Sequence, residues 1–253
     1  MAVTSIFEPG GYRYIRGPFQ YSGGVAAEPG FTIERVRFVR PLALDEGFKR
    51  VEAHLKTIGR PLTSLCACEL RSPAPFSEQG FVDFNRVYVG TLERWGLFSD
   101  EENPVARSNV CPEFDGPPEP SVHAFSYTVI ADHPVCQSFV IAGSAEVKKG
   151  DGPFRDRIIC RGDTTPDALR QKARHVLNTM ETRMLLLDAV WGDSTATHVY
   201  TVHDLHPFLR EEIVASGAAA SEFTWVYARP PVVGLDYEMD VRSVYTEHVV
   251  AER

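Results

Sequence analysis

Three histidines are the first residues whose types and spacing suggest chemistry. His198, His203 and His206 lie close together in the sequence, and imidazole is a common metal ligand. If residues 196–202 form a strand, His198 and His203 point to opposite faces, because side chains alternate along a strand. His203 and His206 fall in the turn that follows. The sequence therefore predicts no metal site among these histidines.

A run of alternating acids is the second candidate. Residues 235–241, LDYEMDV, place Asp236, Glu238 and Asp240 on one face of a strand with period two. Three carboxylates on one face usually meet solvent or line a polar interior. A carboxylate held in such an interior can also transfer protons. Both a solvent-exposed and a catalytic role stay open for Glu238.

Other catalytic and cofactor-binding signatures are missing. The five cysteines are an odd number without CxxC spacing, so we expect reduced, buried thiols in a cytoplasmic protein. The segment GGVAAEPG, residues 23–30, has neither GxGxxG spacing nor a following βαβ pattern. P-loop, HExxH and GxSxG motifs are absent. The sequence thus predicts no cofactor and no metal.

Composition narrows the class of protein. The chain has 253 residues, 43% of them hydrophobic and 24% charged, with a net charge of -8. This balance is typical of a soluble globular protein and disfavours a nucleic-acid binder, which needs a basic surface to neutralise phosphates. There is no apolar run long enough to span a membrane and no secretory signal. We therefore expect a small-molecule partner, with no nucleic acid and no membrane.

The elements that must position these residues occur twice along the chain. Each half begins with an apolar run ending in small residues, Phe19 to Gly30 and Phe139 to Gly150. A helix follows in each half. In the first it carries apolar residues at helical spacing from Phe48 to Ile58, and in the second Thr165 caps it before Pro166.

The later elements repeat as well. Strands at 63–70 and 196–202 each lead to a turn ending in Pro-Phe and then to a second helix, long in the first half and short, about 209–216, in the second. Each half closes with two strands around a double proline. The predicted unit is β-β-α-β-α-β-β, occurring twice. The predicted fold class is α+β, with two tandem domains at residues 1–132 and 133–253. Each domain would be a mostly antiparallel sheet with two helices packed on one face.

Short motifs follow one another in a similar order in the two halves. Those of the first half are YSGGV at 21–25, DFNRVY at 83–88 and ARS at 106–108, and those of the second half are AGSAEV at 142–147, QKARHVLNTME at 171–181 and VHDLHPF at 202–208. With these motifs in this order, both halves resemble the RidA/YjgF family of reactive-intermediate deaminases, which have chorismate-mutase-like folds. The resemblance implies a homotrimer with sites in clefts and hydrolysis of enamines or imines to oxo acids and ammonia.

The resemblance also implies roles for particular residues. Arg107 matches the arginine that holds the substrate carboxylate, which suits a planar guanidinium. Asn85 matches an asparagine on the second helix, and Asn109 occupies the position two after the arginine. The family glutamate falls on Phe125 in the first half but on Glu238 in the second, whereas the second-half arginine position falls near Glu222. One half thus keeps the arginine and the other keeps the acid.

The surrounding residues supply further candidates. Backbone N–H groups near Gly23 and Gly24 would stabilise an oxyanion, and Tyr21 could line the cleft. His123 could be a general base or a structural residue, and Cys111 could be a nucleophile if Arg107 lowered its pKa.

The expected function is hydrolytic deamination of a small enamine or imine acid, such as an aminomuconate-like compound. Arg107 would bind the carboxylate, Glu238 would orient water, and Asn85 and Asn109 would donate hydrogen bonds. Two alternatives stay open: a non-catalytic binding or scaffold protein, and a hydrolase or lyase of a cyclic or aromatic carboxylate, as in the chorismatases. The size of the cleft at Arg107 would discriminate among them.

Overall fold

The computed structural model describes residues 3–132 and 136–251. The first half of the chain supplies β1 (Thr4–Phe7), β2 (Tyr12–Ile15), β3 (Gly24–Ala27), β4 (Phe31–Ala43), α1 (Leu44–Thr57), β5 (Leu65–Arg71), α2 (Glu78–Arg94), β6 (Ala106–Pro112) and β7 (Ser121–Ile130). The second half supplies β8 (Phe139–Ala145), α3 (Pro166–Leu186), β9 (Ala196–Tyr200), a π-helix (Leu209–Val214), β10 (Glu222–Val226), β11 (Ala228–Arg229), β12 (Glu238–Ser243) and β13 (Thr246–Val250). The fold is mixed α+β.

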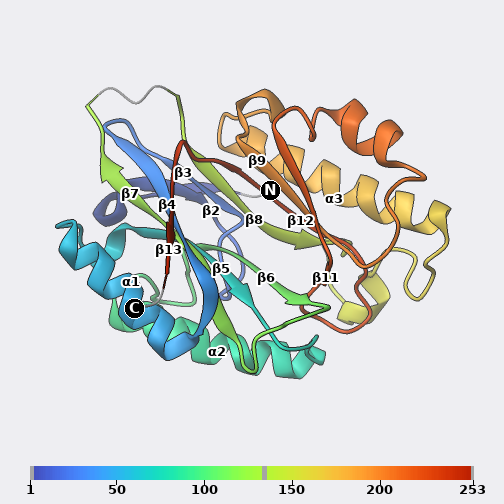
Figure 1. Ribbon diagram of the computed structural model, residues 1–253, viewed down its shortest axis with the longest axis horizontal. Coiled ribbons are helices and arrows are strands. Elements are labelled where there is room, and N and C mark those ends of the chain that lie inside the picture. Colours follow the sequence, from blue (N-terminus) through green and yellow to red (C-terminus); the bar gives the residue numbers. More distant parts are fainter. Residues whose placement is uncertain (1–2, 133–135, 252–253) are drawn as a thin grey trace.

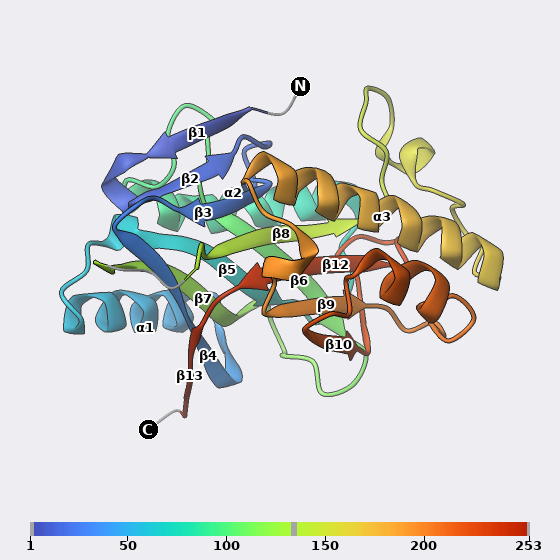
Figure 2. The same ribbon diagram turned by 90° about the horizontal axis from the view of Figure 1, so that it is seen from above.

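Two sheets form the centre of the molecule (Figures 1 and 2). One has seven strands in the order β1-β2-β3-β8-β12-β9-β10, and the other has six in the order β11-β6-β5-β7-β4-β13. Each sheet therefore contains strands from both halves of the chain, whereas the sequence predicted one sheet per half. The predicted boundary between residues 132 and 133 adjoins residues 133–135, which lie outside the described ranges.

Helices cover the outer faces of the two sheets (Figure 1). On α1, Phe48, Val51 and Leu55 are buried against the six-stranded sheet together with the apolar face of α2. On α3, the apolar face packs against β8, β9 and β12 of the seven-stranded sheet. The predicted cap of this helix is confirmed, since the Thr165 side chain accepts a hydrogen bond from the Ala168 N–H.

A third apolar layer joins the two sheets. Val25 and Ala142 from the seven-stranded sheet pack with Ile33, Cys66 and Ala106 from the six-stranded sheet. Beside it, β6 approaches β8, and the backbone N–H of Ser22 donates to the Val105 carbonyl. The two sheets are thereby held together, which brings β6 of the first half beside β8 of the second.

The second half differs from the predicted repeat both before its first helix and after its second, where four strands, β10 to β13, follow instead of two. It has a single strand, β8, before its helix, and residues 146–165 form a loop with one 3-10 turn at Phe154–Arg157. This stretch contains KKGDGP, which lacks the alternating apolar pattern of a strand and is rich in turn residues. This loop lines a cavity instead of adding a strand to the sheet.

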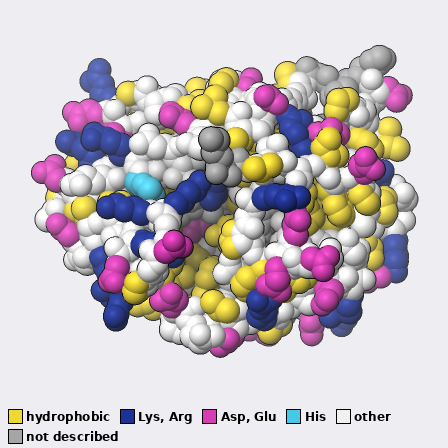
Figure 3. All heavy atoms as spheres, turned by 180° about the vertical axis from the view of Figure 1, so that it is seen from behind, with side chains coloured by type: hydrophobic (Ala, Val, Ile, Leu, Met, Phe, Trp, Pro, Cys, Tyr) yellow, Lys and Arg dark blue, Asp and Glu magenta, His cyan; other side chains and the backbone are white. Residues whose placement is uncertain are grey.

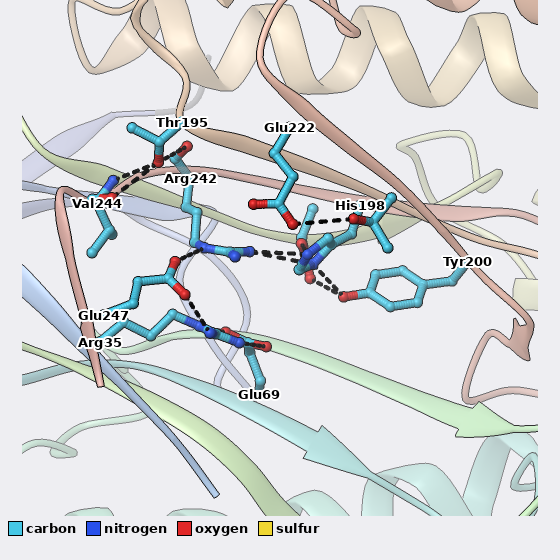
Figure 4. Close-up of polar contacts among 11 residues, drawn as sticks. Arg35, Glu69, Thr195, His198, Tyr200, Glu222, Arg242, Val244 and Glu247 are labelled. Carbon is cyan, nitrogen blue, oxygen red and sulfur yellow. Dashed lines mark hydrogen bonds and ion pairs between the residues drawn. The ribbon is translucent and has the colours of Figure 1, made fainter. Parts of the chain in front are cut away.

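Ion pairs and hydrogen bonds also connect the two sheets (Figure 4). Arg35 of β4 binds Glu69 of β5 through two nitrogens at 2.6 and 2.8 Å, and Glu247 of β13 at 2.8 Å. Glu247 also accepts from Arg242 of β12 at 2.6 Å, and the guanidinium of Arg242 contacts His198 of β9. Because every member of this cluster has a partner, its evident role is to tie β12 and β9 of the seven-stranded sheet to β4, β5 and β13 of the six-stranded sheet.

No helix among residues 3–132 and 136–251 is both long and apolar enough to cross a bilayer. The same ranges contain no group of three or more His, Cys, Asp or Glu side chains arranged to hold a metal ion.

Candidate active site

A cavity of about 140 Å³ lies where the two halves meet. Its walls come from α2 and β6 of the first half and from β8, the loop after it and the start of β12 in the second. The residues lining it are Tyr21, Phe81, Arg107, Asn109, Gly143, Ser144, Ala145, Val147, Phe154, Pro231, Val232, Leu235 and Glu238. The arginine kept by one half and the acid kept by the other therefore face the same space.

Local contacts fix the walls of this cavity. Ser77 caps α2 by accepting from the Gly80 N–H at 3.0 Å, which sets the first turn carrying Phe81. The residue before the cap, Phe76, donates its N–H to the Pro231 carbonyl at 2.8 Å and accepts from the Val233 N–H at 2.9 Å. These bonds hold the second-half segment 231–233 against the start of α2.

Arg107 is buried, with 3% of its surface exposed, and has no carboxylate partner among the described ion pairs. Its Nη1 donates to Oδ1 of Asn85, whose Nδ2 in turn donates to the Phe81 carbonyl at 2.6 Å. The rings of Tyr21 and Tyr88 lie 4.7 and 5.2 Å from its guanidinium carbon. Burial lowers the pKa of Arg107, while these neighbours keep the guanidinium oriented.

Two buried donors at the cavity lack a protein acceptor among the described residues. They are Nε of Arg107 and Nδ2 of Asn109. The other end of the Asn109 amide is fixed, because its Oδ1 accepts from Ser72 Oγ at 3.0 Å. A buried donor without a partner costs free energy, and a cationic one costs more. This arrangement fits a ligand that brings acceptor oxygens, such as a carboxylate.

Glu238 begins β12 and is 4% exposed. Burial and the charge of Asp240 raise the pKa of Glu238 well above its usual value, although the positive charge of Arg107 opposes the shift. Because this shift favours the neutral form of the carboxyl, Glu238 is suited to donate a proton. A raised carboxyl pKa beside a cation in a cavity is typical of a functional site.

Gly143 on β8 makes room for this carboxyl. A Cβ atom built on Gly143 would stand 2.2 Å from Oε1 of Glu238 and 3.0 Å from the Ser108 Cβ. Any larger residue would displace the acid, so glycine is required by the close approach of β8 to β12 and β6.

A buried ionic cluster positions the segment that leads into Glu238. Glu146 accepts from the backbone N–H groups of Asp236 and Tyr237 at 2.6 and 3.1 Å. Lys172 of α3, completely buried, contacts the Asp236 carboxylate and lies 3.6 Å from Glu146. Strand β12 thus starts at a point fixed by α3 and the end of β8, which sets where the Glu238 carboxyl stands.

The remaining predicted residues divide into two groups. Tyr21 lines the cavity, as expected. Asn85 was expected to hydrogen-bond the substrate or water, but it does not line the cavity, and its amide is occupied by Arg107 and the Phe81 carbonyl. Gly23 lines a neighbouring cavity, but its N–H donates to the Ile15 carbonyl at 2.8 Å. It is therefore unavailable to an oxyanion, and Gly24 lies within the β3–β8 ladder.

Cys111 and His123 do not line the cavity. Burial raises the pKa of Cys111 to about 12, which leaves it as a neutral thiol rather than a nucleophile. Burial and the charge of Arg71 lower the pKa of His123 to about 2, so the ring stays uncharged. Both side chains fit structural roles.

Sequence reasoning missed Gly143 and the basic residues around the neighbouring cavity. The small residues of AGSAEV were a signal for Gly143, since they predicted a close approach to the end of this strand. Arg183 on α3 gave no signal, because an arginine on an amphipathic helix usually faces solvent.

Comparisons with known proteins match nearly the whole chain. Residues 4–248 match the family model described as 2-aminomuconate deaminase CnbZ. The chain is 52% identical to a 2-amino-5-chloromuconate deaminase of Comamonas testosteroni, over 99% of this chain and all of that one.

Solved structures resemble the fold at low identity. A chorismatase matches 96% of this chain and 86% of its own with a TM-score of 0.52 and 12% identity. The YjgF protein of E. coli matches 42% of this chain and 80% of its own, with a TM-score of 0.31 and 19% identity. The match along nearly the whole sequence shows that this chain belongs to the 2-aminomuconate deaminase CnbZ family.

Proposed function

We propose that this protein is a hydrolytic deaminase of 2-aminomuconate-like enamine acids. The observation that carries the proposal is that Arg107, with an unpaired buried Nε, and Glu238, with a raised pKa, line one cavity. The family match and the relative that deaminates 2-amino-5-chloromuconate support the same substrate class. The reaction consumes water and yields a 2-oxo acid and ammonia.

Substrate binding would start at the carboxylate beside the amino group. One carboxylate oxygen accepts from Nε of Arg107, and a second acceptor meets Nδ2 of Asn109. Asn85 keeps the guanidinium in place by holding Nη1. The bound carboxylate neutralises Arg107, which removes the charge that opposes the raised pKa of Glu238.

Neutral Glu238 then supplies the first proton. The enamine nitrogen lone pair forms a C=N bond while an electron pair of the conjugated chain takes the proton from Glu238 at carbon. The products of this step are an iminium carbon next to the bound carboxylate and an ionised Glu238. General acid catalysis of this kind typically contributes about 10²- to 10⁴-fold to the rate.

The ionised Glu238 serves the second step. It accepts a proton from a water molecule whose oxygen bonds to the iminium carbon, giving a tetrahedral aminoalcohol. That proton passes to the nitrogen, the C–N bond breaks, and ammonia leaves as the C=O bond forms and the hydroxyl proton returns to Glu238. Over the cycle Glu238 gives one proton to the substrate carbon and recovers one from the attacking water, so it returns to its starting state.

The cavity at Arg107 is small, about 140 Å³ against about 300 Å³ or more for ordinary ligand pockets, so a substrate bound there is either small or extends into the adjoining space. Under the scaffold alternative, side chains such as Phe125 would fill the cleft, but that ring packs in the core with α1. Homotrimer formation stays a prediction; both proposed catalytic side chains come from one chain.

The test is to add purified protein to freshly generated 2-aminomuconate and to record both loss of the diene absorbance and release of ammonia. We expect one ammonia per substrate consumed, at a rate well above the spontaneous one. Glu238→Gln, which keeps the size of the side chain, should lose most of the acceleration. Equal rates with and without the wild-type protein would overturn the proposal.

A further inference from the structure

A second, larger cavity of about 550 Å³ adjoins the first. The two share Tyr21, Phe81, Val147, Phe154 and Val232 as lining residues, so a ligand can extend from one into the other. Its remaining walls come from the segment after β2, from the loop that follows β8 and from α3.

This larger cavity is strongly basic. Its lining includes Arg16, Lys148, Lys149, Arg157 and Arg183, against a single acidic residue, Glu78. The chain as a whole has a net charge of -8, so the concentration of positive charge is local. Figure 3 shows Lys and Arg side chains on either side of the middle of the rear face. A basic cavity in an acidic protein attracts anions.

Arg183 is the cation best placed to bind an anion there. It is half-buried, its Nη1 donates to the Ala142 carbonyl at 2.8 Å, and no acidic side chain forms an ion pair with it among the described residues. A Cβ atom on Gly23 would lie 3.6 Å from its Nε, so the glycine leaves the guanidinium open on that side. By contrast, Arg16 is bound to Glu102 at 3.0 Å.

Each of the two joined cavities is lined by an arginine without an ion-pair partner among the described residues, Arg107 in the first and Arg183 in the second. The electrostatic neighbours of Arg107 and of Arg183 both include Tyr21 and Glu238. Arg107 and Arg183 therefore place two cations in the joined cavities, and neither forms an ion pair with a carboxylate among the described residues. A dianion would balance this arrangement, whereas a monocarboxylate would leave one buried guanidinium unpaired.

We propose that the larger cavity binds the second carboxylate of a dicarboxylate substrate, with Arg183 as its principal contact. The proposal rests on the proposed function and makes Arg183 the residue that selects dicarboxylates over monocarboxylates. Arg107 holds the carboxylate next to the reacting carbon, and Arg183 holds the distal one.

The test uses a matched pair of stable ligands. trans,trans-Muconate and sorbate share the same six-carbon diene and differ by one carboxylate. Their dissociation constants are measured by titration calorimetry with wild-type protein, Arg183→Met and Arg183→Lys. The control is Arg174→Met, which removes an exposed arginine of the same helix that is bound to Glu212. A charge-assisted contact predicts that wild type prefers muconate by about tenfold or more.

Arg183→Met should lose that preference while its sorbate affinity stays within about twofold of wild type. Arg183→Lys should keep part of the preference, and Arg174→Met all of it. Equal affinity of wild type for the two ligands, including no binding of either, would overturn the proposal, as would an equal loss for both in Arg183→Met. Because binding is measured without turnover, a failure of the deaminase proposal would show separately, as binding without ammonia release.

Discussion

Replacing Arg107 by methionine tests whether this buried cation serves substrate binding rather than the stability of the fold. The Nε of Arg107 can form one charge-assisted hydrogen bond with the substrate carboxylate, worth about 1.5–3 kcal/mol. Its loss, at about 1.4 kcal/mol per tenfold, lowers kcat/KM by about 10- to 100-fold. Arg107→Lys keeps the charge without the planar fork, so its activity should lie between those of wild type and Arg107→Met.

The effect of Arg107→Met on stability should be small. The variant loses contacts with the Tyr21 and Tyr88 rings, each worth about 0.5–2 kcal/mol. It also removes a desolvated charge that has no carboxylate partner, and this relieves a penalty of several kcal/mol. We therefore expect the free energy of unfolding to stay within about 2 kcal/mol of wild type.

The assay follows ammonia release from 2-aminomuconate with glutamate dehydrogenase as the coupling enzyme, beside urea denaturation of the same preparations. The control is Arg174→Met, an exposed arginine on α3. A kcat/KM of Arg107→Met within threefold of wild type would refute the carboxylate-binding role. A large fall in both activity and stability would refute the claim that the residue serves the ligand more than the fold.

Three further predictions concern the acid and its supports. Gly143→Ala should lower kcat at least tenfold with little change in melting temperature, because its Cβ would stand 2.2 Å from Oε1 of Glu238; unchanged kinetics would show that this carboxyl can move without cost. The pH profile of kcat/KM should fall on its alkaline side as Glu238 ionises with a pKa well above its usual value, and the limb should vanish in Glu238→Gln. Persistence of that limb in the variant would assign it to another group. Lys172→Met should lower the free energy of unfolding by about 3–5 kcal/mol, measured by urea denaturation at pH 8, because Glu146 and Asp236 lose their buried cation. Burial raises the pKa of Glu146 to about 7, so lowering the pH below that value protonates this carboxyl and should restore part of the stability of Lys172→Met. A free energy of unfolding of the variant that does not change with pH would contradict this.

Local patterns in the sequence predicted local structure well. The helical spacing of Phe48, Val51 and Leu55, the Thr165 cap and the alternation along 235–241 each correspond to an observed element or face. These features depend on neighbours a few residues away, which a single sequence displays directly.

Strand partners could not be predicted in the same way. The pairing of β13 with β4 and of β3 with β8 joins segments far apart in the chain, and alternation identifies a buried face without identifying the neighbouring strand. The apolar pattern fits one sheet per half as well as it fits two sheets that each combine strands of both halves. Only the three-dimensional structure distinguishes these arrangements.

The site was partly predictable for a related reason. Arg107 and Glu238 were found because each half kept a different part of the family motif, and the structure brings both to one cavity. The places of Gly143 and Arg183 at the two cavities depend on how β8 and α3 pack against the other half of the chain, and the local spacing of residues does not encode this packing. His123 and Cys111 were plausible by residue type, yet burial keeps both uncharged near neutral pH.

A crystal structure with trans,trans-muconate bound to Glu238→Gln would test the central claim most directly, because it would locate the substrate site without turnover. The account predicts one carboxylate on Nε of Arg107 and Nδ2 of Asn109, with the diene passing beside residue 238. A ligand bound away from this cavity, with both donors still unpaired, would contradict it.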